Sequence, residues 1–369
     1  MKINTRLLAA GLVALLFIGA IPIISSSSDA DSSFTVKDST GREFTYQSPS
    51  ERVIAFGYAA PLTVALAGQA DKLVGVDNNG VNSLTEYKYT VPETKYPSCT
   101  GANADALYTS ILQEKEAGRL SFDDTIILTT YSANIQENGL RDKLTSAGFK
   151  YVMYFGTMDT YDDMISCIDA ICKACGGTDE AAHMRYVKDF ISTKLADNPR
   201  DKPDAIFIWY SVANGYGYGN TGSLSVAMMN DAGANNIGYN PESSQAAIYD
   251  KTKITQLLDN SENAIIFIDS GYYRTGGKTT DDFVTDILGG SQGEHRIIRM
   301  QQSWNNYDPL AAEGLWMMAC ALYPDLFSGD VPEEHGSNNQ MENIPLYVGI
   351  AIGVVAVAGI ALFLLRSKL

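Results

Sequence analysis

Short apolar runs alternate with amphipathic segments over most of the chain, and the same alternation occurs twice. The first series predicts strands at 52–56, 73–76, 125–128 and 151–154, with helices at 62–67, 135–147 and 161–174. The second predicts strands at 205–209, 264–268 and 295–299, with helices at 223–232, 280–288 and 310–322. Alternating strands and helices indicate βα units around largely parallel sheets. We therefore expect an α/β protein with two Rossmann-like lobes, residues 34–177 and 201–327.

Residues 178–200 lie between these lobes and predict one long helix. Met184, Val187, Ile191 and Leu195 recur on one face, and Asp179 and Glu180 fall in the first turn, where they favour the helix dipole. We expect this helix to bridge the lobes. A cleft between two such lobes is a ligand site by topology, because strand ends present loops and helix N-termini there.

The N-terminal segment has the pattern of a secretory signal. Its apolar stretch, residues 7–24, follows Lys2 and Arg6 and precedes a run of four serines. We assign residues 1–28 to a signal peptide or an uncleaved signal anchor.

The C-terminal segment predicts a membrane helix. Residues 344–365 carry no charge and are long enough, at ~20 residues per span, to cross a bilayer. Cationic residues flank both terminal segments and favour the cytoplasmic side, so we expect an extracytoplasmic domain at the cell membrane. Residues 328–343 are rich in Gly, Ser, Asn and Glu and predict a flexible stalk.

Composition narrows the class of protein. The 369 residues are 45% hydrophobic and 19% charged, which describes a foldable chain of about two domains. The 27 Lys and Arg stand against 43 Asp and Glu, a net charge of −16. This balance excludes a nucleic-acid partner, which requires a basic surface.

No metal or cofactor motif emerges from the cysteines and histidines. Cys172 and Cys175 share the apolar face of a predicted helix with Met164, Ile168 and Ile171, so we interpret Cys167, Cys172 and Cys175 as small buried hydrophobes and not as a metal or cluster motif. The three histidines are scattered along the sequence, and no cluster of metal ligands is expected. We predict no cofactor and no enzymatic centre.

A glycine-rich run at 217–222 formally matches G-x-G-x-x-G, the dinucleotide fingerprint. It begins eight residues after the predicted strand, and no acidic residue follows at the expected distance. We instead interpret it as glycine-enabled turns that expose Tyr216 and Tyr218, with Ser223 as a helix N-cap.

Aromatic and amide side chains gather in the segments that follow the predicted strands. Aromatic rings with a polar tip suit a large, partly planar ligand, and a guanidinium can clamp a carboxylate or phosphate. The alternatives are that the rings pack the lobe cores and that Arg274 makes a surface ion pair. Asn220 and Asn305 belong to the same group. The ligand-binding candidates are Tyr58, Asn78, Asn79, Tyr131, Ser132, Trp209, Tyr210, Tyr216, Tyr218, Tyr272, Tyr273, Arg274 and Trp304.

Several short stretches follow one another in a specific order. They are FTVKDSTGREFT at 34–45, ERVIA at 51–55, LVGVDN at 73–78, TYDDM at 160–164 with the Gly176-Gly177 helix end, and 222–237. In this order they resemble the periplasmic solute-binding proteins of ABC transporters for iron–siderophores, haem and cobalamin, the class with two lobes joined by a long helix. The resemblance covers about 34–327, and archaeal members of the family are often held by a C-terminal membrane helix.

The resemblance implies a non-enzymatic receptor for a metal chelate, a ferric siderophore, haem or a corrinoid, with an ABC permease and its ATPase as partners. Members commonly dock the permease through one acidic residue on each lobe. Asp105 is the candidate in the first lobe, whereas Thr255 occupies the matching position in the second. The segment 81–100 is an atypical insertion that can line the cleft.

Two other classes of function remain open from the residues themselves. One is an extracytoplasmic oxidoreductase or haem-handling enzyme that uses the run at 217–222 and the cysteines. The other is a structural surface or adhesion module, which would bind no small molecule.

Overall fold

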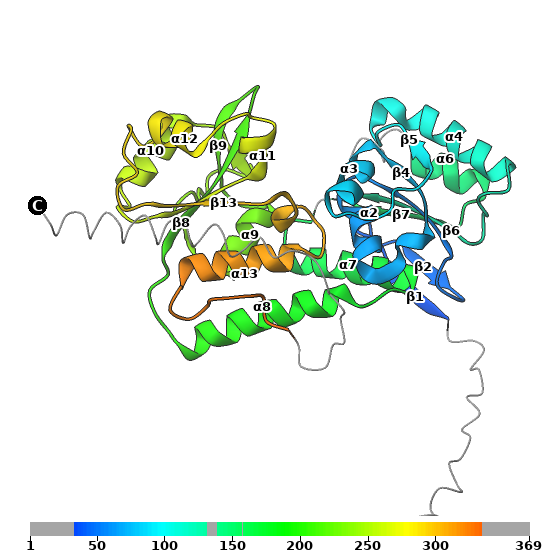
Figure 1. The fold of residues 1–369 in the computed structure, drawn as a ribbon, viewed down its shortest axis with the longest axis horizontal. Coiled ribbons are helices and arrows are strands. Elements are labelled where there is room, and N and C mark those ends of the chain that lie inside the picture. The colour runs from blue at the N-terminus through cyan, green and yellow to red at the C-terminus, as the bar shows by residue number, and fades with distance from the viewer. Residues whose placement is uncertain (1–32, 131–138, 157, 334–369) are drawn as a thin grey trace, which may run out of the picture.

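The structure is a computed structural model that describes residues 33–130, 139–156 and 158–333. The expected signal segment, most of the stalk and the expected membrane helix lie outside these residues. Within the described ranges, no helix is both long and apolar enough to cross a membrane. The described chain forms two α/β lobes side by side, which we call the N-lobe (to residue 177) and the C-lobe (from residue 201) (Figure 1).

The N-lobe is built on a five-stranded parallel sheet in the order β5-β4-β3-β6-β7. All of Val53 to Phe56 in the central strand is buried, because helices cover both faces of the sheet. An antiparallel pair, β1 (Phe34–Lys37) and β2 (Glu43–Tyr46), lies beside it. The sheet strands are β3 (Arg52–Phe56), β4 (Leu73–Asp77), β5 (Thr94–Tyr96), β6 (Thr125–Thr130) and β7 (Tyr151–Phe155).

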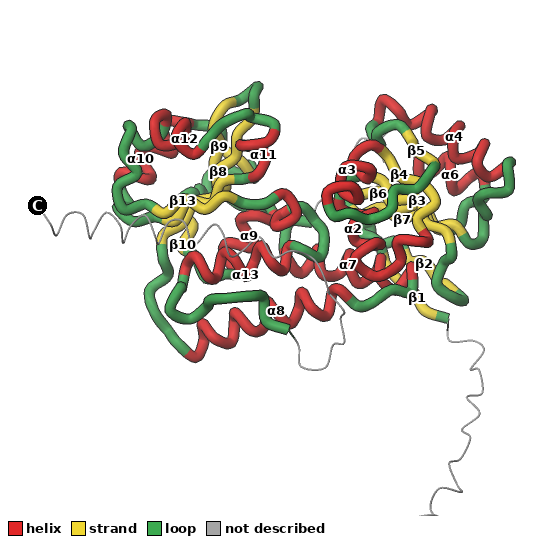
Figure 2. The backbone as a smooth tube through the Cα atoms, in the orientation of Figure 1, coloured by secondary structure: helices red, strands yellow, loops and turns green. Residues whose placement is uncertain are grey.

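Helices flank this sheet on both faces, and strands lie between helices in each lobe (Figure 2). The helices are α2 (Ala59–Val64), η1 (Ala65–Gln69), η2 (Ala70–Lys72), α3 (Asn78–Glu86), η3 (Gly101–Asn103), α4 (Ala104–Glu116), α6 (Leu140–Ala147) and α7 (Tyr161–Cys175). The strand order reverses between β3 and β6, and such a reversal opens a crevice at the carboxyl ends of the strands.

The C-lobe sheet is mixed. Its order is β11-β9-β8-β12-β13, with β10 beside β8. Strands β8, β10, β12 and β13 are parallel, whereas β9 and β11 run antiparallel to their neighbours. The strands are β8 (Asp204–Ser211), β9 (Gly215–Gly219), β10 (Asn235–Asn236), β11 (Ala247–Ile248), β12 (Ile265–Ile268) and β13 (Arg296–Arg299). The helices of the C-lobe are α9 (Leu224–Asp231), α10 (Lys251–Asp259), α11 (Ser270–Arg274), α12 (Thr280–Asp286), η4 (Gln302–Asn305) and α13 (Ala311–Leu322).

The glycine-rich run departs from expectation. Residues 215–219 form β9, which pairs with β8 and places Tyr216 opposite Tyr210. Tyr216 and Tyr218 are therefore buried, so the predicted exposed turn is wrong. A Cβ on Gly217 would lie 2.9 Å from the Tyr249 ring, so this glycine serves close packing. Ser223 is confirmed as the N-cap of α9, because its hydroxyl accepts the Val226 N–H.

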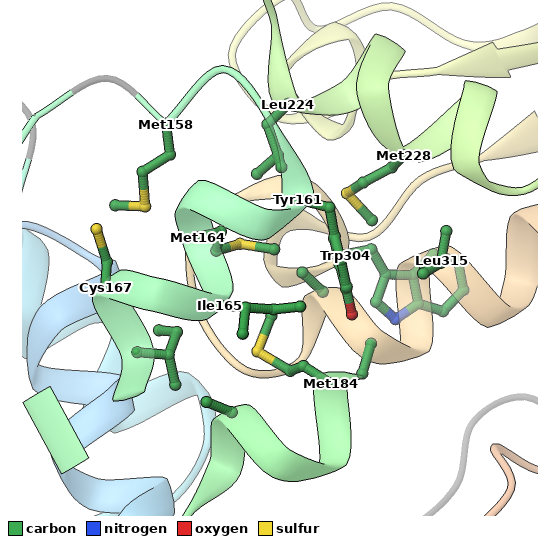
Figure 3. Close-up of a cluster of buried hydrophobic side chains, with 14 of the residues drawn as sticks. Met158, Tyr161, Met164, Ile165, Cys167, Met184, Leu224, Met228, Trp304 and Leu315 are labelled. Atoms are coloured by element: carbon green, nitrogen blue, oxygen red, sulfur yellow. The ribbon is translucent and has the colours of Figure 1, made fainter. Parts of the chain in front are cut away.

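Helix α8 (Glu180–Asp197) forms in the predicted interval and packs against α7 and α13. Its buried face, Met184, Val187 and Ile191, joins a core that continues from the N-lobe into the C-lobe. Figure 3 shows part of this core, where Tyr161 and Met164 of α7 lie near Met228 and Trp304 of the C-lobe. Each fully buried apolar side chain of this size stabilises the fold by about 1.5–3 kcal/mol, so this core holds the lobes together.

The cysteines of α7 pack as the sequence predicts. Cys167, Cys172 and Cys175 are buried in the shared core and form no disulfide. Burial raises the pKa of all three thiols to about 12, so each remains protonated.

Candidate ligand-binding cleft

A cavity of about 410 Å³ lies between the two lobes. This volume falls within the range of small-molecule sites. Helices α3 and α11 lie on the facing sides of the lobes (Figure 1). The N-lobe contributes Tyr58, Asn79 and Asn82 to the lining. The C-lobe contributes Asp269, Ser270, Gly271, Arg274 and Thr275 near α11, and Gln302, Asn305 and Asn306 around η4.

A buried carboxylate positions the N-lobe wall. Asp77 ends β4 and is fully buried, and its Oδ1 accepts the N–H groups of Gly57 (3.1 Å) and Gly80 (3.0 Å). Its Oδ2 accepts the N–H of Cys99 at 3.0 Å. One side chain thus fixes the turn before Tyr58 and caps the helix that carries Asn79.

A second aspartate positions the C-lobe wall. Asp269 directly follows β12, and its Oδ1 accepts the Gly271 N–H at 2.9 Å at the start of α11. Its Oδ2 accepts from Asn305 Nδ2 at 3.3 Å, and the same amide donates to Ser225 Oγ at 3.1 Å. Asn305 is therefore held by two partners, and η4 is tied to the end of the strand.

Two polar contacts join the lobes beside the cavity. Arg274 Nη1 lies 3.5 Å from Glu86 Oε2, which also accepts the Tyr58 hydroxyl at 2.9 Å. The Tyr87 hydroxyl donates to Ser303 Oγ at 2.8 Å. Burial raises the pKa of Tyr58 and raises that of Tyr87 to about 12, so both phenols remain protonated donors at neutral pH.

Behind the contact with Ser303 lies a buried acidic residue. Asp308 is fully buried, and its Oδ1 accepts the Leu310 N–H at 3.0 Å. Its Oδ2 has no hydrogen-bond partner within the part of the chain that the structure describes. Burial raises the pKa of Asp308 well above its usual range, and the nearby carboxylates of Glu313 and Glu86 raise it further.

Some predicted ligand residues meet in this cavity. Tyr58 follows β3 at the strand-order reversal, Asn79 lies in the first turn of α3, and Arg274 ends α11. Asn305, from the same group of amides, also lines it. Asn78 is exposed next to Asn79 but is not part of the lining.

Most predicted tyrosines of the C-lobe lie in its core instead. Tyr216, Tyr218 and Tyr272 are buried together beneath the sheet, and Tyr210 makes edge contacts with Tyr216 and Tyr272. Tyr273 packs on Tyr272 and lies under a guanidinium, that of Arg299, at 4.2 Å. None of these rings is among the described residues that line the cavity.

The two predicted tryptophans also pack against other side chains. Trp209 contacts Phe207, with ring centroids 4.9 Å apart. Trp304 is buried in the core shared by the lobes (Figure 3), and its indole N–H donates to Glu313 Oε2 at 3.2 Å. Tyr131 and Ser132 lie outside the described residues.

Sequence reasoning did not name seven of the lining residues: Asn82, Asp269, Ser270, Gly271, Thr275, Gln302 and Asn306. Asp269 and Ser270 directly follow the buried strand β12, which is the signal that could have found them. Asn306 belongs to the polar segment that follows β13, in which the prediction included Trp304 and Asn305 but not Asn306.

The expected docking residue lies away from the cavity. Asp105 is in the first turn of α4, with its side chain 87% exposed, and it pairs with Lys143. Thr255, at the matching position in the C-lobe, lies on α10 and donates to the Ile287 carbonyl at 3.2 Å. No group of three or more His, Cys, Asp or Glu side chains suited to a metal ion occurs among the described residues.

The insertion at 81–100 is partly structured. It includes the end of α3 and strand β5, and Tyr96 packs edge-on against Phe56 in the core beneath the N-lobe sheet. Tyr87 reaches Ser303 across the lobes, and Asn82 lines the cavity. The start of the insertion therefore borders the cleft, whereas its end packs away from it.

The fold is that of the periplasmic binding proteins with two α/β lobes. A solute-binding protein from Veillonella parvula matches with a TM-score of 0.56 and 14% identity, over 81% of this chain and 88% of its own. Helicobacter pylori CeuE, in a nickel–histidine complex, matches with a TM-score of 0.55 and 17% identity, over 80% and 89%. The periplasmic heme-binding protein RhuT from Roseiflexus sp. RS-1 matches with a TM-score of 0.52 and 14% identity, over 74% and 98%. The sequence matches no protein-family model and no curated protein.

Proposed function

We propose that this chain is the solute-binding protein of an ABC importer. It captures a metal chelate, an iron–siderophore, haem or a cobalamin-like corrinoid, between its lobes and delivers it to the permease and its ATPase. The observation that carries the proposal is the cavity between the lobes, walled by residues that both lobes contribute at the ends of β3, β12 and β13. Proteins of this fold include periplasmic heme-binding proteins and the nickel–histidine complex of CeuE.

The proposed receptor is not an enzyme and is held at the membrane. The sequence at 344–365 supports a C-terminal anchor of the archaeal type, and the segment 1–28 supports export of the binding domain. Helix α8 then serves as the rigid bridge, since its buried face belongs to the core that spans both lobes.

The test is thermal unfolding of the full-length protein with haemin, a ferric hydroxamate, a ferric catecholate or cobinamide. A ligand present at 100 times its dissociation constant adds about 2.7 kcal/mol to the free energy of unfolding. We expect at least one chelate to raise the unfolding temperature. Stabilisation by a nicotinamide or flavin dinucleotide, with none by a chelate, would contradict the proposal and favour the oxidoreductase. No stabilisation by any of these compounds would favour the structural module.

A further inference from the structure

Carboxamides and hydroxyls dominate the described lining of the cavity. Asn79 and Asn82 lie on the α3 side, and Gln302, Asn305 and Asn306 lie around η4. A carboxamide presents both donors and an acceptor. Covering such groups with an apolar surface leaves their donors and acceptors unpaired, which is unfavourable. This lining therefore discriminates against a flat hydrocarbon face and in favour of a ligand edged with carbonyl, amide or hydroxyl groups.

The charges at the cavity also restrict the ligand, because they disfavour one with several negative charges. Arg274 is the cationic side chain among the described lining residues, and it already faces Glu86 at 3.5 Å. Asp269 adds a carboxylate to the same lining. A ligand with several negative charges would meet two carboxylates for one guanidinium, which disfavours it in a cleft partly shielded from water.

Tyr58 contributes a neutral phenol. Its hydroxyl donates to Glu86 Oε2 at 2.9 Å, beside a carboxylate that opposes loss of the phenolic proton. A phenol held in this way offers hydrogen bonding and ring contact, and it is poorly placed to bind a metal as a phenolate.

We propose that the cavity selects a metal chelate whose rim is polar and carries no net negative charge, and whose metal takes no ligand from Tyr58. A ferric hydroxamate or an amide-fringed corrinoid has this chemistry, whereas haem and a ferric tricatecholate do not. This inference rests on the proposed function and narrows its ligand class. Asn79, Asn82 and the amides around η4 contact the rim of the ligand.

The test measures dissociation constants of the full-length protein by quenching of its tryptophan fluorescence. The probes are ferrichrome, cobinamide, haemin and a ferric tricatecholate. We expect ferrichrome or cobinamide to bind at least about tenfold more tightly than haemin and the tricatecholate, which corresponds to about 1.4 kcal/mol.

Two neighbouring substitutions locate the site. Asn79→Leu removes a lining carboxamide, and Asn78→Leu makes the same change at the adjacent exposed position outside the lining. We expect about tenfold weaker binding of the preferred chelate for Asn79→Leu, because the leucine leaves a polar group of the ligand without a partner. We expect unchanged binding for Asn78→Leu.

The outcomes separate this inference from the function on which it rests. Tightest binding of haemin or the tricatecholate would overturn the inference and leave the proposed receptor intact. Equal affinities of the Asn79→Leu and Asn78→Leu variants would overturn the assignment of Asn79 to the ligand contact. Failure of all four probes to bind would overturn the receptor and the ligand class together.

Discussion

At the scale of single residues, the most unusual group is the carboxyl of Asp308. It is fully buried, it accepts one backbone N–H, and the other carboxylates that face it are Glu313 and Glu86. Burial raises its pKa, so the folded protein holds the Asp308 proton more tightly than the unfolded chain does. The neutral acid is thus the stable form behind the Tyr87–Ser303 contact between the lobes.

Asp308→Asn should change how stability depends on pH. With a raised pKa in the folded state, the free energy of unfolding of the natural protein falls as pH rises from about 3.8 towards the folded pKa. The substituted carboxamide does not titrate, and its oxygen remains an acceptor for the Leu310 N–H. We therefore expect equal stability near pH 4 and a more stable variant at pH 7, by about 1.4 kcal/mol for each unit of the shift.

Urea unfolding from pH 4 to pH 8 measures this difference. Glu313→Gln is a second variant for the same test, and we expect it to change the pH dependence of stability in the same direction. Burial also raises the Glu313 pKa, and glutamine keeps the acceptor for the Trp304 N–H. Parallel stability curves for the natural protein and Asp308→Asn across the whole range would refute the raised pKa.

At the scale of elements, the contact between α13 and η4 determines one wall of the cleft. Gly314 of α13 packs so closely on η4 that a Cβ would lie 2.2 Å from the Trp304 carbonyl oxygen. Backbone atoms cannot move aside as the end of a flexible side chain can. The position of Gln302 and Asn305 in the cavity therefore depends on a glycine at 314.

Gly314→Ala should destabilise the protein by about 1–3 kcal/mol, the usual cost of overpacking, although alanine favours a helix by about 1 kcal/mol over glycine. Affinity for a chelate should fall too, because η4 must shift. Urea unfolding and ligand titration measure the two effects. Ala196→Ser, which adds one atom at an exposed position in α8, is the control and should lie within about 0.5 kcal/mol of the natural protein. Equal or greater stability of Gly314→Ala would show that the contact is loose.

Periodicity predicted the buried central strands, and it missed several short elements as well as the 13-residue helix α4. The runs at β3, β8 and β12 are continuous and apolar, because both faces of these strands are covered, and so they were found. Strand β9 alternates glycine with tyrosine, and its composition indicates a turn unless the partner strand β8 is known. Helix α11 is too short to show a helical period.

At the scale of the whole molecule, the sequence predicted the place of the site better than its lining. The cleft between lobes follows from the order of strands and helices, and Tyr58, Asn79 and Arg274 were found because they follow strands. The tyrosines of the C-lobe share that position along the chain. The rings of Tyr210, Tyr216 and Tyr218 turn into the core because β8 and β9 pair, and a local sequence pattern does not show this pairing.

Docking to a permease is also a property of the whole molecule. A substitution at Asp105 tests whether this residue takes part in docking. The side chain is 87% exposed on α4 and does not line the cavity. If it meets arginines of the permease, Asp105→Lys places like charges together and should lower uptake by about tenfold or more in cells that express the importer. Affinity for the chelate should not change, because the lining is untouched.

Glu116→Lys provides a matched control for this prediction. It makes the same change of charge at the exposed last residue of α4, about 16 Å along the helix from Asp105. Uptake should remain near that of the natural protein in Glu116→Lys, so net charge alone does not explain a loss seen with Asp105→Lys. Uptake near that of the natural protein in both variants would remove Asp105 from the docking surface, and an equal loss in both would attribute the loss to the change of net charge instead.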